Sequence, residues 1–142
     1  MFLGEAEHSL DAKGRVILPA KYRDQLKDGA YIAKGRGRCL FVYTAEEFEQ
    51  VAQRMRDTAR RGEKELQAAR TFFAGADEIT PDKQGRVAIP HHLREFARLE
   101  RDAVVAGVYS RIEIWDRQRW RERDREGDES LTESSDLPDF GI

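Results

Sequence analysis

The stretch Asp11–Pro19, which reads DAKGRVILP, recurs later in the chain as DKQGRVAIP at Asp82–Pro90. Each copy has Asp, Gly and Arg at matching positions, followed by three apolar residues and a proline. Aligning residues 72–97 with residues 1–26 gives nine identities in 26 positions. Unrelated segments would share about one or two, so the chain contains a tandem duplication. The identical pairs are Phe2/Phe73, Gly4/Gly75, Glu7/Glu78, Asp11/Asp82, Gly14/Gly85, Arg15/Arg86, Val16/Val87, Pro19/Pro90 and Arg23/Arg94.

Each copy is expected to begin with a tight turn that leads into a short strand. Asp and Gly occupy the first and fourth turn positions, where a carboxylate accepts from backbone N–H groups and glycine tolerates unusual dihedral angles. We therefore assign Asp11, Gly14, Asp82 and Gly85 to the turn itself, and we do not interpret the aspartates as catalytic acids. The apolar residues after each arginine predict a strand, and the proline is expected to be the first residue of a short helix.

Two further strands are predicted in each repeat. Residues 30–33 and 39–43 are β-prone and flank the basic, glycine-rich segment at residues 34–38. Residues 103–108 and 112–115 match them in the second repeat. A unit of about 50 residues is marginal for burying its own core, so we expect the two units to interleave and pair their exposed strand edges.

Helices are expected after each repeat. Thr44 and Asp116 are the predicted N-caps, and apolar residues recur at helical spacing from Phe48 to Phe73. After Trp120 the chain is charged and polar, so we expect disorder beyond about residue 126. The predicted organisation is a first repeat over residues 5–48, a helical connector over 49–75, a second repeat over 76–120 and a charged, disordered acidic tail over 121–142.

The charge of the chain is unevenly distributed. The net charge is −2, but residues 122–142 carry eight acidic and two basic side chains. Residues 1–121 therefore hold 23 basic and 19 acidic side chains, a net charge of +4. A basic folded part with an acidic end is compatible with binding an anionic partner. The single Cys39 fits a reducing compartment, and no apolar run has the length of a membrane span, so we expect a cytoplasmic protein.

Several motifs, in order across residues 1 to about 121, resemble the MraZ family of bacterial transcriptional regulators. These motifs are MFLGE at residues 1–5, DAKGR at 11–15, LPA at 18–20, CLFVY at 39–43, FFAG at 72–75, DKQGR at 82–86 and IEIW at 112–115.

The resemblance implies a mainly β fold with short helices (α+β). It would consist of two tandem swapped-hairpin β-barrel units, similar to those of AbrB and SpoVT, that form a pseudo-dimer. The family regulates the division and cell-wall gene cluster. Its chains assemble into rings that bind short direct repeats in double-stranded DNA upstream of their own gene. The partners implied are therefore promoter DNA and further copies of the chain, with no membrane and no small-molecule substrate, in the cytoplasm and on the nucleoid.

The same resemblance implies DNA contact by Arg15 and Arg86. Their chemistry agrees, because a guanidinium at a rigid strand end is a good bidentate partner for guanine and for phosphate. Lys13 and Lys83 lie in the same turns and are candidate phosphate contacts.

Functional classes other than a DNA-binding regulator are also compatible with parts of the sequence. A purely structural or interaction ring, and an antitoxin-like binder of the AbrB superfamily, stay open as alternatives. We do not expect an enzyme, because no repeated Ser/His/Asp or Cys/His constellation occurs. We expect no metal and no cofactor, because His91 and His92 are adjacent while His8 and Cys39 are distant in sequence.

Overall fold

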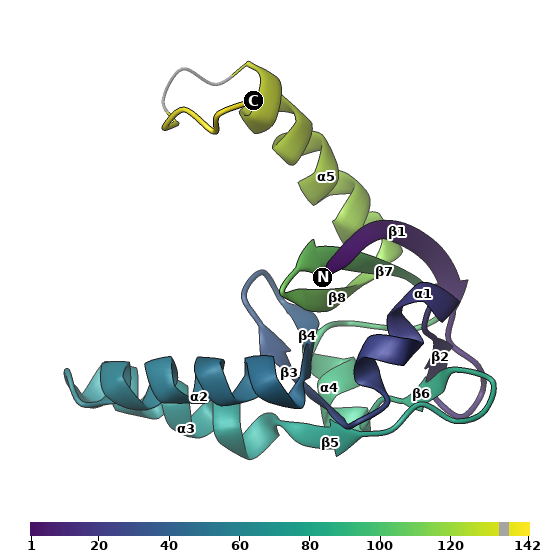
Figure 1. The fold of residues 1–142 in the computed structure, drawn as a ribbon, viewed down its shortest axis with the longest axis horizontal. Coiled ribbons are helices and arrows are strands. Elements are labelled where there is room, and N and C mark those ends of the chain that lie inside the picture. Colours follow the sequence, from purple (N-terminus) through teal and green to yellow (C-terminus); the bar gives the residue numbers. More distant parts are fainter. Residues whose placement is uncertain (134–136) are drawn as a thin grey trace.

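The computed structural model describes residues 1–133 and 137–142 and is mainly β, with short helices (Figure 1). Its strands are β1 (Phe2–Ser9), β2 (Arg15–Ile17), β3 (Ala30–Gly35), β4 (Cys39–Thr44), β5 (Asp77–Ile79), β6 (Arg86–Ala88), β7 (Asp102–Tyr109) and β8 (Arg111–Asp116). Its helices are α1 (Ala20–Arg23), a 3-10 turn (Asp24–Leu26), α2 (Ala45–Ala59), α3 (Glu63–Gly75), α4 (His91–Phe96) and α5 (Arg117–Thr132). The expected α+β class is confirmed, although each proline caps its helix and does not begin it.

The two repeats exchange strands within one sheet. The strand order is β1-β7-β8-β4-β3-β5, and every neighbouring pair is antiparallel. Strand β1 of the first repeat pairs with β7 of the second, while β5 of the second repeat pairs with β3 of the first. The order is symmetric about β4 and β8, where Phe41 faces Glu113. The expected interleaving of the two units is therefore confirmed.

The sheet does not close into the expected barrel. Strands β1 and β5 are its two edges, and each pairs with one neighbour. Strand β5 is three residues long, against eight for β1 at the opposite edge. It starts just after α3 ends at Gly75, and Pro81, which has no N–H to donate, follows it closely. The barrel expectation is therefore wrong for this chain.

The duplicated motifs form a separate two-stranded ribbon. Strands β2 and β6 pair antiparallel with Val16 opposite Val87, the equivalent residue of the other repeat. Hydrogen bonds from Leu18 N to Gly85 O (2.9 Å) and from Ile89 N to Gly14 O (3.1 Å) extend the ribbon at both ends. Figure 1 shows the ribbon at the end of the molecule opposite the α2–α3 connector.

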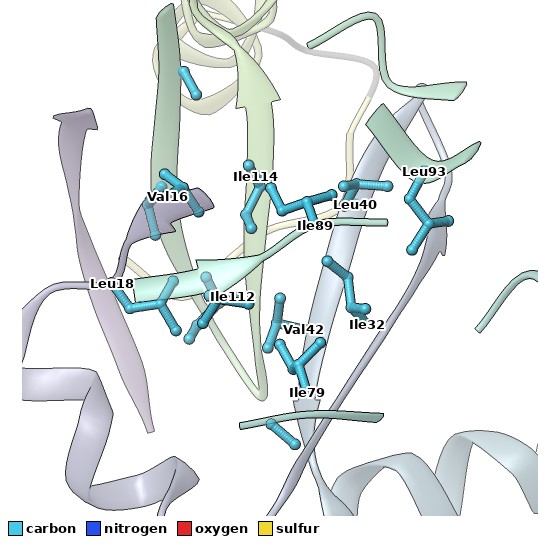
Figure 2. Packing of buried hydrophobic residues seen from close by; sticks show 14 of the residues in the cluster. Val16, Leu18, Ile32, Leu40, Val42, Ile79, Ile89, Leu93, Ile112 and Ile114 are labelled. Carbon is cyan, nitrogen blue, oxygen red and sulfur yellow. The ribbon is translucent and has the colours of Figure 1, made fainter. Parts of the chain in front are cut away.

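Both repeats supply one hydrophobic core. Val16 and Val87 point from the ribbon into this core and are fully buried. Figure 2 shows Val16 and Leu18 of the first repeat facing Ile112 and Ile114 of the second. Neither repeat buries these residues alone, which agrees with the small size of each unit.

The connector packs on the sheet through aromatic side chains. Thr44 caps α2 as expected, because its hydroxyl accepts from Glu47 N at 3.1 Å. The Phe48 ring stacks on Tyr31 at 4.5 Å and on Phe72 of α3 at 6.1 Å. These contacts fix the two helices against strand β3.

The expectation of disorder after Trp120 is wrong as far as Thr132, where α5 ends. The Asp116 carboxylate caps this helix by accepting from Arg119 N at 3.1 Å. The Trp120 indole donates to Glu5, and Arg121 pairs with Glu7 at 3.2 Å, so β1 holds the first turns. The remaining turns of α5 are rich in Arg and Glu, whose high helix propensity favours a helix even where no face is buried. Residues 134–136, also predicted to be disordered, lie outside the described residues.

In the described part of the chain, none of the helices combines the length and apolar character needed to cross a bilayer.

The strand exchange can be tested at Gly107 on β7. A Cβ there would lie 2.5 Å from Leu3 N and 2.7 Å from the Tyr22 hydroxyl oxygen, so the backbone of β1 would have to move. We expect Gly107→Ala to lower the free energy of unfolding by about 1–3 kcal/mol in urea titrations. Gly127→Ala on exposed α5 is the matched control, because its Cβ meets no atom within 4 Å. Equal stability of the two variants would contradict the β1–β7 pairing.

Candidate nucleic-acid interface

The first motif folds into a turn in which one carboxylate organises both backbone and side chain. The Asp11 Oδ1 atom accepts from the backbone N–H groups of Lys13 and Arg15, each at 2.9 Å. Its Oδ2 atom accepts from Arg15 Nε at 2.7 Å. Gly14 closes the turn by donating to Asp11 O at 3.0 Å, with a φ of 75° that disfavours other residues. The turn assignments of Asp11 and Gly14 agree with this geometry.

The second motif repeats this geometry. Asp82 Oδ1 accepts from Gln84 N at 2.9 Å and from Arg86 N at 2.8 Å, and its Oδ2 accepts from Arg86 Nε at 2.7 Å. Gly85 has a φ of 81° and donates to Asp82 O at 2.9 Å. Each arginine is therefore held by the aspartate of its own turn through one edge of the guanidinium.

The turns also shift the acidity of the aspartates. The Arg15 backbone N–H lowers the pKa of the Asp11 carboxyl below its ordinary value of 3.8, and the Arg15 guanidinium lowers this pKa further. The Arg86 backbone N–H and guanidinium lower the pKa of Asp82 in the same way. Both aspartates are thus carboxylates at neutral pH, and neither has the raised pKa of a general acid.

The ribbon register places both arginines on one face. Arg15 lies opposite Ala88, and Arg86 lies opposite Ile17. Cross-strand partners, and residues two apart on a strand, share a face, so these four side chains lie together while the two valines point inward. Ile17 and Ala88 are exposed, and the arginines are half-buried. Ideal strand geometry separates the two arginine Cα atoms by about 7 Å along the ribbon and about 5 Å across it.

Lys13 and Lys83 lie in the two turns and are exposed. They are not equivalent, because Lys83 aligns with Ala12 and Lys13 aligns with Gln84. Each turn therefore carries one lysine, but at a different position relative to its arginine.

Two further arginines at this surface were missed from the sequence. A Cβ on Gly14 would collide with the guanidinium of Arg94, and one on Gly85 would collide with that of Arg23. Each of these arginines thus packs on the turn of the other repeat. Arg23 Nε donates to Leu18 O at 3.0 Å, whereas Arg94 Nε is buried with no hydrogen-bond partner among the described residues. The sequence did carry a signal for these residues, because Arg23 and Arg94 are identical in the alignment of the two repeats.

The basic hairpin at residues 34–38 is held in place by the second repeat. Arg119 donates to Gly37 O at 2.7 Å and to Arg38 O at 3.0 Å, and the Arg38 guanidinium lies 5.0 Å from the centre of the Phe96 ring. Cys39 is buried, and burial raises the pKa of its thiol to about 12, so it is a poor nucleophile. Within residues 1–133 and 137–142, no group of three potential metal ligands occurs.

The coupling within each turn predicts a specific change in acidity. Arg15→Ala should raise the pKa of Asp11 towards 3.8, because the guanidinium is lost, but should leave Asp82 unchanged. Because the pKa of Asp11 is lower in the folded than in the unfolded chain, its ionisation stabilises the fold at pH values above 3.8. This stabilisation is lost as the pH falls below 3.8 and through the folded pKa, so the substitution should change the pH dependence of stability in that acidic range. NMR titration of the carboxyl carbons measures both values. An unshifted Asp11 in the unsubstituted protein would contradict the turn geometry.

Comparisons with known proteins agree on one family. The family model described as "MraZ protein, putative antitoxin-like" matches residues 1–69 and 72–136, once for each repeat. The protein named transcriptional regulator MraZ from Salinispora arenicola is 51% identical over 120 residues, which is 84% of each chain. The protein of the same name from Salinispora tropica has the same identity and coverage. With both repeats matched and more than half of the aligned residues identical, the chain belongs to the MraZ family.

Proposed function

We propose that this chain is a non-catalytic, sequence-specific DNA-binding transcriptional regulator. It acts in the cytoplasm, on the nucleoid, and binds direct repeats upstream of its own gene as a ring of identical subunits. The observation that carries the proposal is the exposed ribbon face with Arg15 and Arg86, each oriented by an aspartate of its own turn. The names of the relatives support the regulatory role.

The dimensions of the ribbon suit the major groove of DNA. That groove is about 12 Å wide and admits a two-stranded β-ribbon. Each aspartate bonds the Nε atom of its arginine, and among the described residues the terminal guanidinium nitrogens make no hydrogen bond, so they can serve a guanine edge or a phosphate. Ile17 lies on the same face, opposite Arg86 and two residues from Arg15, and supplies an apolar contact for a thymine methyl group.

The surrounding charges favour phosphate binding. Lys13 and Lys83 extend from the turns, while Arg23 and Arg94 pack beside the glycines. These four side chains outnumber the carboxylates of the two turns. Phosphate contacts supply affinity and register, and base contacts supply specificity, so the lysines belong to the first role and the ribbon arginines to both.

A purely structural ring is the second candidate, and the Asp–Arg pairs favour it. In that case each arginine is neutralised to stabilise its turn, and the ribbon face binds no DNA. The two candidates differ in salt dependence, because neutralising phosphates releases counterions and makes binding fall steeply with salt.

The first test removes the ribbon arginines from the full-length chain. Because both lie on one face, Arg15→Ala and Arg86→Ala should each weaken binding to the DNA upstream of the gene. Each lost base contact costs about 1–3 kcal/mol, and each lost phosphate contact reduces the salt slope by about one. Fluorescence anisotropy at several salt concentrations measures both quantities. Arg54→Ala, exposed on α2, is the control and should bind like the unsubstituted chain.

Three outcomes separate the candidates. Weaker binding with unchanged melting temperature and subunit number supports the DNA interface. A lower melting temperature that accounts for the loss supports the structural ring. Unchanged affinity in both variants would refute the ribbon as the DNA-binding surface.

The second test concerns assembly. Among the described residues, β1 and β5 each pair with a strand on one side only, and a head-to-tail contact that closes generates a ring. We expect multi-angle light scattering at micromolar concentration to give a mass several times the 16.4 kDa of one chain. A stable monomer would contradict the ring while leaving the ribbon proposal to the arginine variants.

A further inference from the structure

A groove of about 860 Å³ lies between α2 and α3, on the part of the connector that projects from the sheet (Figure 1). Leu66 and the partly exposed Phe73 are among its apolar lining residues. Three arginines line it as well, Arg56, Arg60 and Arg70, against the single lining carboxylate of Glu63. The groove therefore combines an apolar surface with a positive charge.

The arginines of the groove are weakly engaged within the chain. Arg60 lies 3.9 Å from Asp57, and both side chains are largely exposed. Arg70 donates to the neutral amide oxygen of Gln67 at 3.2 Å. Neither contact neutralises a buried charge, so these guanidinium groups are available to an acidic partner.

The chain carries a segment with the complementary character. Residues 137–142 read LPDFGI and expose Leu137 (43%) and Phe140 (58%) on either side of Asp139. The preceding part of α5 is acidic, with Asp128 and Glu129 near its end. Two exposed apolar side chains that flank a carboxylate match an apolar groove lined by arginines.

The position of α5 directs this segment away from the groove of its own chain. Arg117 pairs with Asp102 at 3.1 Å, and Arg121 pairs with Glu7 at 3.2 Å, so α5 is fixed to β7 and β1. Figure 1 shows α5 leaving the sheet on one side and the α2–α3 connector leaving it on another. We infer that residues 137–142 of one copy dock into the α2–α3 groove of a second copy.

This contact goes beyond the proposed DNA-binding function and does not depend on it. It adds a link between copies that uses neither the ribbon nor the sheet edges. The arginine variants of the ribbon test DNA binding separately, so either proposal can fail alone.

The test uses a fluorescein-labelled peptide with the sequence of residues 128–142 and full-length protein. The acceptor is the Leu137→Ser/Phe140→Ser variant, whose own segment has lost both apolar side chains and so competes poorly for the groove. We expect saturable binding by anisotropy, and at least a tenfold loss when Arg56→Glu, Arg60→Glu and Arg70→Glu are added. Arg54→Glu, on α2 but outside the groove lining, is the matched control and should keep binding. Circular dichroism establishes that each variant is folded.

A mixing experiment identifies the second copy as the source of the segment. The Leu137→Ser/Phe140→Ser chain keeps its groove, and the triple arginine variant keeps its segment, so a mixture should form the contact between the two chains. Donor and acceptor dyes on the two variants should then show, in addition to any transfer across the ring contact, a component of energy transfer that the free peptide abolishes. The inference would be overturned if the peptide did not bind, or if the arginine variants bound it as well as the acceptor does. It would also be overturned if the free peptide left the energy transfer unchanged.

Discussion

The fold depends on the exchange of strands between its two repeats. Eight residue pairs join β1 to β7, and three join β5 to β3, so the edge strand that each repeat contributes is paired by the other. Without the exchange, each repeat would expose unpaired strand edges and an incomplete core. The β2–β6 ribbon is part of the same constraint, because its inward valines come one from each repeat and meet in that shared core. The position of the two motifs on one surface follows from the topology.

Within each motif, the aspartate positions the arginine side chain and also neutralises part of its positive charge. An arginine side chain has many rotamers, and ordering them on binding costs free energy. The Asp11 and Asp82 carboxylates order Arg15 and Arg86 in advance, through bonds of 2.7 Å to Nε. For the proposed binding of DNA, they also reduce the local positive field that attracts phosphate. The lysines in the turns, and the arginines packed on the glycines, offset that reduction.

The sequence predicted the local structure well because the relevant signals are local. The spacing of Asp11 and Gly14 defines a turn, the residues after Arg15 define a strand, and Thr44 defines a helix start. The open sheet was not predictable in this way, because which strands become its edges depends on pairings between distant parts of the two repeats. Helix α5 was missed because the prediction required buried apolar residues, whereas capping, helix propensity and ion pairs with β1 hold it. The placement of Arg23 and Arg94 depends on contacts between repeats, which no single motif contains.

The crosswise packing of Arg94 on Gly14 and of Arg23 on Gly85 has an evolutionary consequence. After a duplication, one copy is usually free to diverge while the other keeps the original role. Here each turn depends on a side chain encoded in the other copy, so a substitution in one half of the gene alters the surface built by the other half. The contacting residues of the two halves are therefore constrained together, and neither half can be transferred alone to another protein as an independent module.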